Sequence, residues 1–309
     1  MITVVSLNSA MDRTILVNEL KRGQVQRALQ VNVQAGGKGL NVARAVRRLG
    51  EAVRVTGFAG GLVGSFLRSE CRRLGIDDRL TDSGQETRTC YIFAEENGSG
   101  ATVVNEPGPT VTPDEVAAFM AAYAEALGGS AVVVLSGSLP PGVPATLYRE
   151  LLERANAAGV RTILDSSGLP LQEGIAAHPW AIKPNEEEFA ELVGGAPSGD
   201  AGLKAHCRDL SDRGIPQVIV TLGGEGAFLG SGDRYFRIRP PRIRLLNPTG
   251  CGDAFVAGLA VSTVRGEPIL EAVRLGTACA AGNAASLEPD IPTGDALAHY
   301  LAGVDIQEV

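Results

Sequence analysis

The run NPTGCGDAF, at residues 247–255, combines two glycines with a carboxylate in front of an apolar stretch that predicts a buried helix. Gly250 and Gly252 allow successive backbone N–H groups to converge on one point, where the helix dipole adds positive potential. A phosphoryl group in transfer carries negative charge that suits such donors. Asp253 beside them can accept a proton from an attacking hydroxyl. By itself, Asp253 would be interpreted as an ordinary acidic residue in the first turn of a helix. The two glycines instead favour a site for phosphoryl transfer.

A second glycine-rich run, AGGKGLNVA at 35–43, surrounds Lys38 with three glycines at the start of a predicted helix. This arrangement favours a phosphate or polyhydroxyl ligand, and the alternative is a solvated lysine in a plain turn. A Walker A loop is absent, because Gly39 follows Lys38 where that motif needs Ser or Thr. The dinucleotide fingerprint is absent after the first predicted strand as well.

Further polar or glycine-rich segments follow other predicted strands. Asp12 lies in SLNSAMDR, Ser138 in VLSGSLPPG, and a glycine cluster in VTLGGEG. The segment IKPNEEEF holds Lys183, Asn185 and Glu188, with a helix cap at Asn185 as the simplest interpretation. Because the carboxyl ends of parallel strands share one edge of a sheet, these segments together predict a ligand site there.

The elements that position these residues alternate along the chain, which predicts an α/β fold with a doubly wound, mostly parallel sheet over residues 1–309 as one domain. Apolar runs predict strands buried on both faces at 3–7, 53–60, 131–137, 161–167, 180–185 and 217–224. Three- and four-residue spacing predicts helices at 40–50, 65–75, 113–128, 144–159 and 185–194.

Two insertions, at about 13–35 and 87–105, alternate polar and apolar residues, with a turn at 96–100. Alternation predicts strands with one solvated face, so we expect a small second sheet. It can serve as a flap over a pocket or as a dimer interface. The residues expected on its apolar face are Val31, Val33, Tyr91, Phe93 and the run Ile15–Val17. An uncovered apolar face favours aggregation, which predicts a homodimer through this sheet.

Composition excludes several classes of protein. The net charge of −7 argues against a broad nucleic-acid surface. Five scattered cysteines without a C-x-x-C pair, and three distant histidines, fit a reducing cytoplasm and no cysteine or histidine metal site. We expect neither a signal peptide nor a membrane span.

The two glycine-rich runs resemble the signatures of the PfkB, or ribokinase-like, family of carbohydrate kinases. GGKGLNVA is similar to its N-terminal signature and NPTGCGDAFVAG to its C-terminal one. SLNSAMDRT, NEPGP, LSGSLPPG and IKPNEEEF resemble the phosphosugar branch, which contains 1-phosphofructokinase, tagatose-6-phosphate kinase and a minor 6-phosphofructokinase. Cys251 stands where the family usually has Ala or Ser. The pair Asn247-Pro248 is closer to tagatose-6-phosphate kinases than to 1-phosphofructokinases.

The resemblance implies a three-layer α/β/α domain with a β-sheet lid. It also implies an ATP- and Mg²⁺-dependent kinase of a ketohexose phosphate, either fructose 1-phosphate or tagatose 6-phosphate. Asp253 would be the base, beside an anion hole formed by the N–H groups of Gly250, Cys251 and Gly252. The implied substrate-binding residues are Asp12, Arg27, Gly37, Lys38, Asn41, Arg88 and Ser138, with Arg27 reaching from the lid of the same or of a partner subunit. The implied ATP-binding residues are Lys183, Asn185, Thr221, Gly223, Gly226 and Asn283. Asn185 and Glu188 would act on Mg²⁺ mainly through water.

Other functions stay open. A kinase of an unphosphorylated sugar or nucleoside is one, although cations at Lys38, Arg88 and Arg27 favour a sugar phosphate. A sugar-sensing module is another, although the intact run from Gly250 to Asp253 favours an enzyme. A dehydrogenase is disfavoured because the dinucleotide fingerprint is missing. We also expect the helix start to lower the pKa of the Cys251 thiol, against the opposing charge of Asp253.

Overall fold

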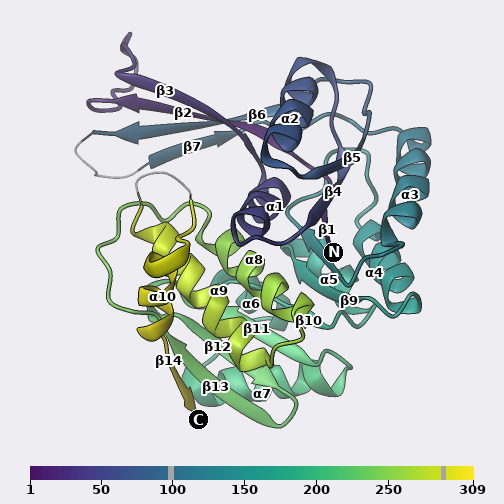
Figure 1. The fold of residues 1–309 in the computed structure, drawn as a ribbon, viewed down its shortest axis with the longest axis vertical. Helices are drawn as coiled ribbons and strands as arrows, with labels where there is room; N and C mark the ends of the chain where they lie inside the picture. The colour runs from purple at the N-terminus through teal and green to yellow at the C-terminus, as the bar shows by residue number, and fades with distance from the viewer. Residues whose placement is uncertain (97–100, 287–289) are drawn as a thin grey trace.

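The structure is a computed structural model that describes residues 1–96, 101–286 and 290–309. Within these residues, ten strands form one large sheet in the order β14-β13-β12-β11-β10-β9-β8-β1-β4-β5 (Figure 1). The strands are β1 (Ile2–Ser6), β4 (Val53–Phe58), β5 (Asp77–Thr81), β8 (Val132–Ser136), β9 (Arg161–Asp165), β10 (Ala181–Ile182), β11 (Gln217–Thr221), β12 (Ala227–Ser231), β13 (Arg234–Arg239) and β14 (Asp305–Glu308).

The sheet is mostly parallel, as the sequence predicted. From β5 to β11 neighbouring strands pair in parallel, whereas β12, β13 and β14 extend one edge in antiparallel pairs. All six predicted strands are present, although the one expected at 180–185 is limited to Ala181–Ile182. After β1 the chain builds first toward β5 and then, from β8, in the other direction. The strand order therefore reverses between β1 and β8, where such sheets bind ligands at their carboxyl ends.

Helices cover both faces of the sheet and complete the predicted three layers (Figure 1). One apolar core joins the sheet to α1 (Lys38–Arg48), α2 (Gly61–Leu74), α8 (Cys251–Val264), α9 (Ile269–Ala284) and α10 (Gly294–Ala302). The other core joins it to α3 (Pro113–Leu127), α4 (Leu147–Ala157), α5 (Gly168–Ile175), α6 (Glu186–Val193) and α7 (Gly199–Asp212). A short 3-10 helix, η1 (Gly223–Glu225), follows β11. The five helices predicted from spacing are all present within a few residues of their expected bounds.

The uninterrupted apolar runs of the strands have a simple cause in this layering. Along β1, Val4 packs into the first core and the adjacent Val5 into the second, because successive side chains point to opposite faces. Both positions are fully buried. A strand covered on both faces therefore has no polar position to alternate with.

The predicted second sheet is also present and is called the lid sheet here. It contains β2 (Ala10–Val17), β3 (Gln30–Gly36), β6 (Arg88–Glu95) and β7 (Ala101–Asn105), in the order β3-β2-β6-β7. The central pair β2 and β6 is parallel, and both outer pairs are antiparallel. The lid sheet projects from the body beside α1 and α2 (Figure 1). The turn predicted at 96–100 lies, apart from its first residue, outside the described residues.

The alternation predicted for the lid sheet holds in part, because Ile92 and Val103 lie on the face opposite to the predicted apolar one. Register places Ile15 opposite Val31 and Phe93, and places Arg13 opposite Val33 and Tyr91. The predicted apolar residues therefore share one face, except Leu16, which points to the other face as the neighbour of Ile15. The solvent-accessible fraction is 45% for Val31, 38% for Val33 and 53% for Val104, so this apolar face is incompletely covered.

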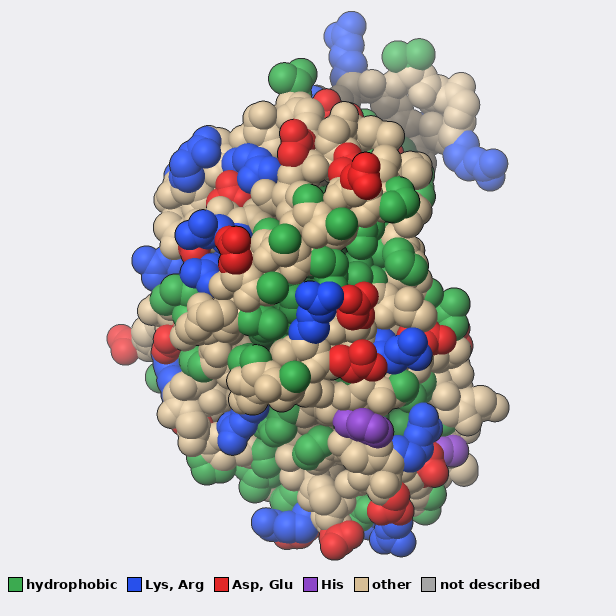
Figure 2. Space-filling model, turned by 90° about the vertical axis from the view of Figure 1, so that its right-hand side faces the viewer, with side chains coloured by type: hydrophobic (Ala, Val, Ile, Leu, Met, Phe, Trp, Pro, Cys, Tyr) green, Lys and Arg blue, Asp and Glu red, His purple; other side chains and the backbone are tan. Residues whose placement is uncertain are grey.

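The charged side chains visible on one side of the body do not form a field of one sign (Figure 2). Figure 2 shows Lys, Arg, Asp and Glu side chains interspersed over one side of the body. Among the described residues, no helix is long and apolar enough to cross a bilayer.

Candidate active site

A cavity of about 1130 Å³ lies at the carboxyl edge of the parallel strands, beneath the lid sheet. Small-molecule sites usually measure about 300–1000 Å³, so this cavity is as large as the largest of them. Its wall includes Ser6 at the end of β1, Ser136 at the end of β8 and Asp165 at the end of β9. The start of α8 forms another part of the wall, and Cys90 of the lid sheet lies in the wall as well.

Most of the residues singled out in the sequence line this one cavity. They are Asp12, Gly37, Lys38, Asn41, Arg88, Ser138, Lys183, Asn185, Glu188, Thr221, Gly223, Gly226, Gly250, Cys251, Gly252 and Asp253. They come from segments more than 200 residues apart, which the shared strand edge brings together. Arg27 and Asn283 are the two singled-out residues that do not line it.

Helix α8 begins at the cavity wall with the glycine turn that the sequence predicted. Gly250 is the N-cap residue and has a φ of 78°, in the left-handed region that favours glycine. Gly250, Cys251 and Gly252 all line the cavity, and the first N–H groups of a helix have no acceptor within that helix. The Lys183 ammonium lies close to them, since a Cβ built on Gly252 would be 3.6 Å from its Nζ. An anion in this position would meet both the N–H groups and the ammonium.

Asp253 is a buried carboxylate in the first turn of α8. Its Oδ2 accepts a hydrogen bond of 2.9 Å from Asn41 Nδ2 of α1. Burial raises the pKa of Asp253 to about 7, with a further contribution from the negative charge of Asp165. The Asn41 hydrogen bond and the charges of Lys38 and Lys183 oppose this rise. A carboxylate with a pKa near neutrality is well matched to accepting and releasing a proton.

Asp165, at the end of β9, is a site residue that our reading of the sequence missed. Its side chain is 1% exposed, and Oδ1 forms an ion pair of 3.0 Å with Lys183 Nζ. Ser136 Oγ donates to Oδ2 over 3.2 Å. Burial opposes ionisation, but the charges of Lys183 and Lys38 outweigh it and lower the pKa of Asp165. The available signal was a carboxylate at the carboxyl end of the strand predicted at 161–167, the edge of the sheet where the other polar segments were singled out.

Lys38 lies between two carboxylates. Its Nζ is 3.6 Å from Glu188 Oε1 and 4.0 Å from Asp165 Oδ1. The charge of Asp165 is the main cause that raises the pKa of Lys38, which is therefore an ammonium at neutral pH. Asn185 and Glu188 form the capping box of α6, with two reciprocal bonds of 2.8 Å. The prediction that Asn185 is a helix cap is thus confirmed. Glu188 in addition pairs with the ammonium of Lys38 at the cavity.

The lid sheet and the ends of β1 and β8 form the other part of the cavity. Arg88 at the start of β6 donates from Nε and Nη2 to the carbonyl oxygen of Asn8, and from Nη1 to that of Glu106. Asn8 Nδ2 in turn donates to Ser138 Oγ over 3.2 Å. Burial raises the pKa of Asp12, although the charges of Arg44 and Arg88 oppose the rise. This part of the cavity combines a guanidinium with hydroxyl, amide and carboxyl groups, a set suited to a charged polyhydroxyl ligand.

Asn283, on α9, supports the glycine turn from behind. Its Nδ2 donates to the carbonyl oxygen of Thr249 over 2.8 Å and to Cys251 Sγ over 3.4 Å. The predicted lowering of the Cys251 pKa was wrong. Burial raises the pKa of this thiol and Asp253 adds to the rise, so the hydrogen bond from Asn283 is outweighed. The N–H groups at the helix start therefore lower the pKa of this thiol by less than its loss of hydration raises it.

Arg27 lies in the segment between β2 and β3, where its side chain is exposed. This segment projects past the body of the molecule at the edge of the lid sheet (Figure 1). Arg27 therefore does not line the cavity of its own chain.

The model of the pfkB family of carbohydrate kinases matches residues 1–292 of this sequence. The chain belongs to the PfkB family. Its two signature segments, around Lys38 and Asp253, meet in the cavity described above. The predicted resemblance is thereby confirmed, and with it the activity class of a carbohydrate kinase.

Solved structures agree with this assignment. A possible 1-phosphofructokinase from Thermotoga maritima is 26% identical with a TM-score of 0.92, over 100% of this chain and 99% of that one. Phosphofructokinase-2 from Escherichia coli, in complex with fructose-6-phosphate, is 25% identical with a TM-score of 0.88, over 98% of both chains. A ribokinase from Thermotoga maritima, 23% identical over 98% of this chain and 99% of that one, has a TM-score of 0.81 and shares the fold. The fold is therefore ribokinase-like.

Proposed function

We propose that this PfkB carbohydrate kinase transfers the γ-phosphoryl group of ATP to a hydroxyl of a ketohexose phosphate, giving a bisphosphate. The leading substrates are fructose 1-phosphate and tagatose 6-phosphate. The observation that carries the proposal is the shared cavity, in which the buried carboxylate of Asp253 and the start of α8 lie with Arg88 and Lys38. A sugar that already bears a phosphate needs cations in addition to the phosphoryl-transfer groups.

In the proposed reaction, Asp253 removes the proton from the attacking sugar hydroxyl. The hydroxyl oxygen forms a bond to the γ-phosphorus as the bond to the bridging oxygen of ADP breaks. The N–H groups of Gly250, Cys251 and Gly252 stabilise the negative charge on the transferring group. The proton leaves Asp253 when the bisphosphate dissociates, which restores the base. A pKa of Asp253 near 7 suits both steps at neutral pH.

The sugar phosphate is proposed to bind Arg88 and Lys38, with Lys38 exchanging Glu188 and Asp165 for the phosphate. Asp12, Asn41 and Ser138 orient the sugar, and Gly37 allows its close approach to the backbone. ATP is assigned to the wall formed by Lys183, Asn185, Thr221, Gly223 and Gly226, on the other side of the α8 start. Arg27 is assigned to the active site of a partner subunit, because it is remote from the cavity of its own chain.

Mg²⁺ fits this proposal because Glu188 already holds a cation at the cavity, the ammonium of Lys38. Oxygen donors are the ligands that Mg²⁺ prefers, and it usually keeps several waters. Asn185 and Glu188 would hold it mainly through water. When bound, Mg²⁺ neutralises charge on the β- and γ-phosphates.

A dimer through the lid sheet is proposed as the working form. The apolar face with Val31, Val33 and Val104 is turned away from the cavity, because the opposite face carries Asp12 and Cys90. A second copy of the same face would cover it and would bring the segment with Arg27 near the neighbouring cavity. We also propose the cytoplasm as its location, since all five cysteines are free thiols.

The test is ADP release across a panel of fructose 1-phosphate, tagatose 6-phosphate, fructose 6-phosphate, free fructose, free tagatose and adenosine. The highest kcat/KM is expected for one of the first two, after subtraction of the ATP hydrolysis seen without a sugar. A higher kcat/KM for a free sugar or for adenosine would overturn the choice of substrate. Binding of a sugar phosphate without any ADP release would instead support the sensing module.

A further inference from the structure

Arg44 is a half-buried arginine on α1 that neither the predicted site nor the proposed reaction uses. Its Nη2 donates to Asn41 Oδ1 over 3.0 Å, and Asn41 Nδ2 donates to Asp253 Oδ2 over 2.9 Å. Its Nη1 donates to the carbonyl oxygen of Ala35 on β3 over 2.7 Å. The guanidinium thus links one strand of the lid sheet to the proposed base through a single amide.

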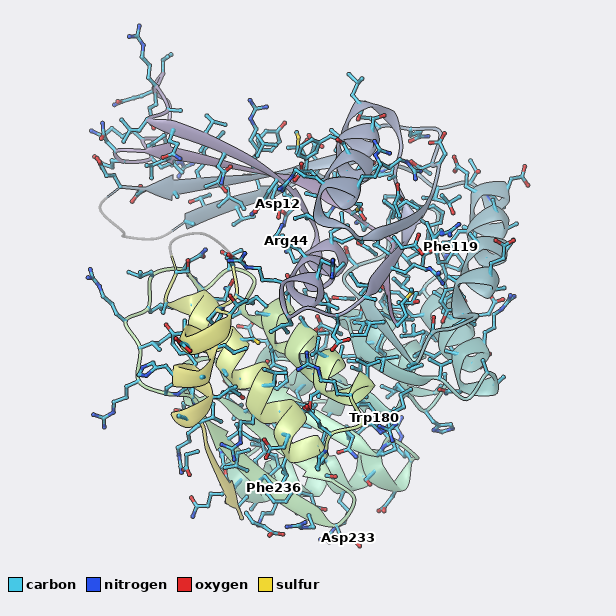
Figure 3. The ribbon with its side chains drawn as sticks, in the orientation of Figure 1. Asp12, Arg44, Phe119, Trp180, Asp233 and Phe236 are labelled. Carbon is cyan, nitrogen blue, oxygen red and sulfur yellow. The ribbon has the colours of Figure 1, made fainter. Side chains whose placement is uncertain are left out.

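Helix geometry accounts for the first contact. Asn41 and Arg44 are three residues apart on α1, so their side chains lie on the same face of the helix. That face is turned toward α8, which packs against α1, and toward the end of β3. Figure 3 labels Arg44 where α1 meets the lid sheet, with Asp12 of β2 nearby.

The donors and acceptors of Arg44, Asn41 and Asp253 fix the direction of these two hydrogen bonds. A guanidinium has five N–H donors and no acceptor, so the end of the Asn41 amide that faces Arg44 must be its oxygen. The NH₂ end then faces Asp253, whose ionised carboxylate accepts only. Without Arg44, Asn41 Oδ1 loses this donor, and the amide is held less firmly in the orientation that donates to Asp253.

We propose that Arg44 is a positioning residue, which fixes the orientation of the Asn41 amide and thereby holds the carboxylate of Asp253 in place as an ionised base. The inference rests on the proposed function for its catalytic meaning, although the positioning itself is a property of the folded chain. Through the carbonyl of Ala35, the same side chain ties the lid sheet to this base.

Charge supports the geometry. Arg44 lies near both Asp12 and Asp253, the two carboxylates that would flank the sugar, and their charges oppose the lowering of its pKa by burial. Reciprocally, the guanidinium favours the ionised form of Asp253. Asp290 and Glu70 act on the pKa of Arg44 in the same direction as Asp12 and Asp253, and Asp290 lines a small pocket together with Arg44 and Asp253. The charged or titratable groups that interact with Asp253 include Lys38 on α1, Asp165 on β9, Lys183 after β10 and Cys251 on α8.

The experiment compares Arg44→Met and Arg44→Lys with wild type, and uses Arg47→Met as the matched control. Arg47 lies on the same helix with an exposed side chain, so its substitution changes the net charge equally. Two readouts are measured from pH 5 to 9. One is kcat with the best sugar phosphate of the panel. The other is the titration of the Asp253 carboxyl carbon by NMR in protein labelled with ¹³C-aspartate, assigned with Asp253→Asn.

In Arg44→Met we expect kcat to fall about 100-fold, the cost of misplacing a catalytic group by about 1 Å. The acidic limb of kcat and the Asp253 titration should both move to higher pH, by about one unit for the loss of one hydrogen bond to a charged acceptor. Arg44→Lys should restore part of both effects, because it keeps the charge without the planar fork. Arg47→Met should leave both unchanged.

A folded Arg44→Met variant with the wild-type titration of Asp253 would overturn the inference, whatever its activity. A loss of kcat in which neither the pH profile nor the titration moves would mean a purely structural role and would overturn it as well. The NMR readout needs no substrate. A wild-type protein that phosphorylates no member of the panel would therefore refute the proposed function while the titration still decides the role of Arg44.

Discussion

Replacing Asp253 by Asn should abolish turnover and at the same time stabilise the protein at neutral and alkaline pH. Burial raises the pKa of this carboxyl from 3.8 to about 7 in the folded chain. The folded state therefore binds the proton more tightly than the unfolded state does. As pH rises from about 4 to about 7, ionisation of Asp253 lowers the stability of the wild type, and the full loss is present above pH 7.

The size of the effect follows from the two pKa values. A difference of about three, at about 1.36 kcal/mol for each unit of pKa, corresponds to about 4 kcal/mol. The asparagine side chain of the variant resembles the neutral carboxyl and lacks this loss. The unfolding free energy of Asp253→Asn minus that of the wild type should thus increase by up to about 4 kcal/mol between pH 4 and pH 8. Over the same range kcat of the wild type should rise with an apparent pKa near 7.

The assay is urea unfolding of both proteins at pH 4, 5, 6, 7 and 8, with kcat measured at the pH values where the fold is intact. Asp295→Asn serves as the control, because Asp295 is also a first-turn acid of a helix but is exposed. A general base contributes about 10²–10⁴-fold to the rate, so Asp253→Asn should lose at least that much of kcat at pH 8. A stability difference that does not change between pH 4 and pH 8 would refute the assignment of a neutral pKa to Asp253. A variant that keeps more than about a tenth of wild-type kcat would remove it from the role of base.

Three other predictions concern the sugar site, the lid sheet and the helix start. Arg88→Ala and Lys38→Ala should each weaken binding of a phosphorylated sugar about 10- to 150-fold, and that of its unphosphorylated parent much less, because a charge-assisted contact is lost; inhibition constants for both sugars measure this, and equal losses would count against a phosphate contact. Val33→Asp should convert a dimer into a monomer at tens of micromolar, as seen by light scattering, because it places a charge on the exposed apolar face; a wild type that is already monomeric there would contradict the interface. Cys251 should alkylate slowly with iodoacetamide at pH 7 and still gain rate at pH 9, with protection by ATP and Mg²⁺, because burial raises its pKa; rapid labelling at pH 7 would show that the helix start dominates after all.

Sequence alone was sufficient for the fold class, the lid sheet and many of the polar and glycine residues that line the cavity. These features depend on local rules. Apolar runs of strand length predict buried strands, alternation predicts the half-exposed strands of the lid, and Gly250 predicts a turn that few other residues adopt. Topology then requires the ends of parallel strands to meet at one edge, which brings Asp12, Ser138 and Asn185 together. Elements with weak local signals, such as β14 and α10, were not predicted, because packing against β13 and α9 defines them.

Only the tertiary structure decided how these residues act on one another. Asp165 pairs with Lys183, and the amide of Asn41 connects Arg44 to Asp253. Arg27, in contrast, lies away from the cavity of its own chain. Each of these relations depends on segments that are far apart in the sequence. Burial shows the same dependence. The helix start around Cys251 can be predicted from the sequence. The loss of hydration that raises the pKa of its thiol, however, depends on the segments that surround it. Spacing reports which groups one segment can present, whereas the charge state of a group depends on everything packed around it.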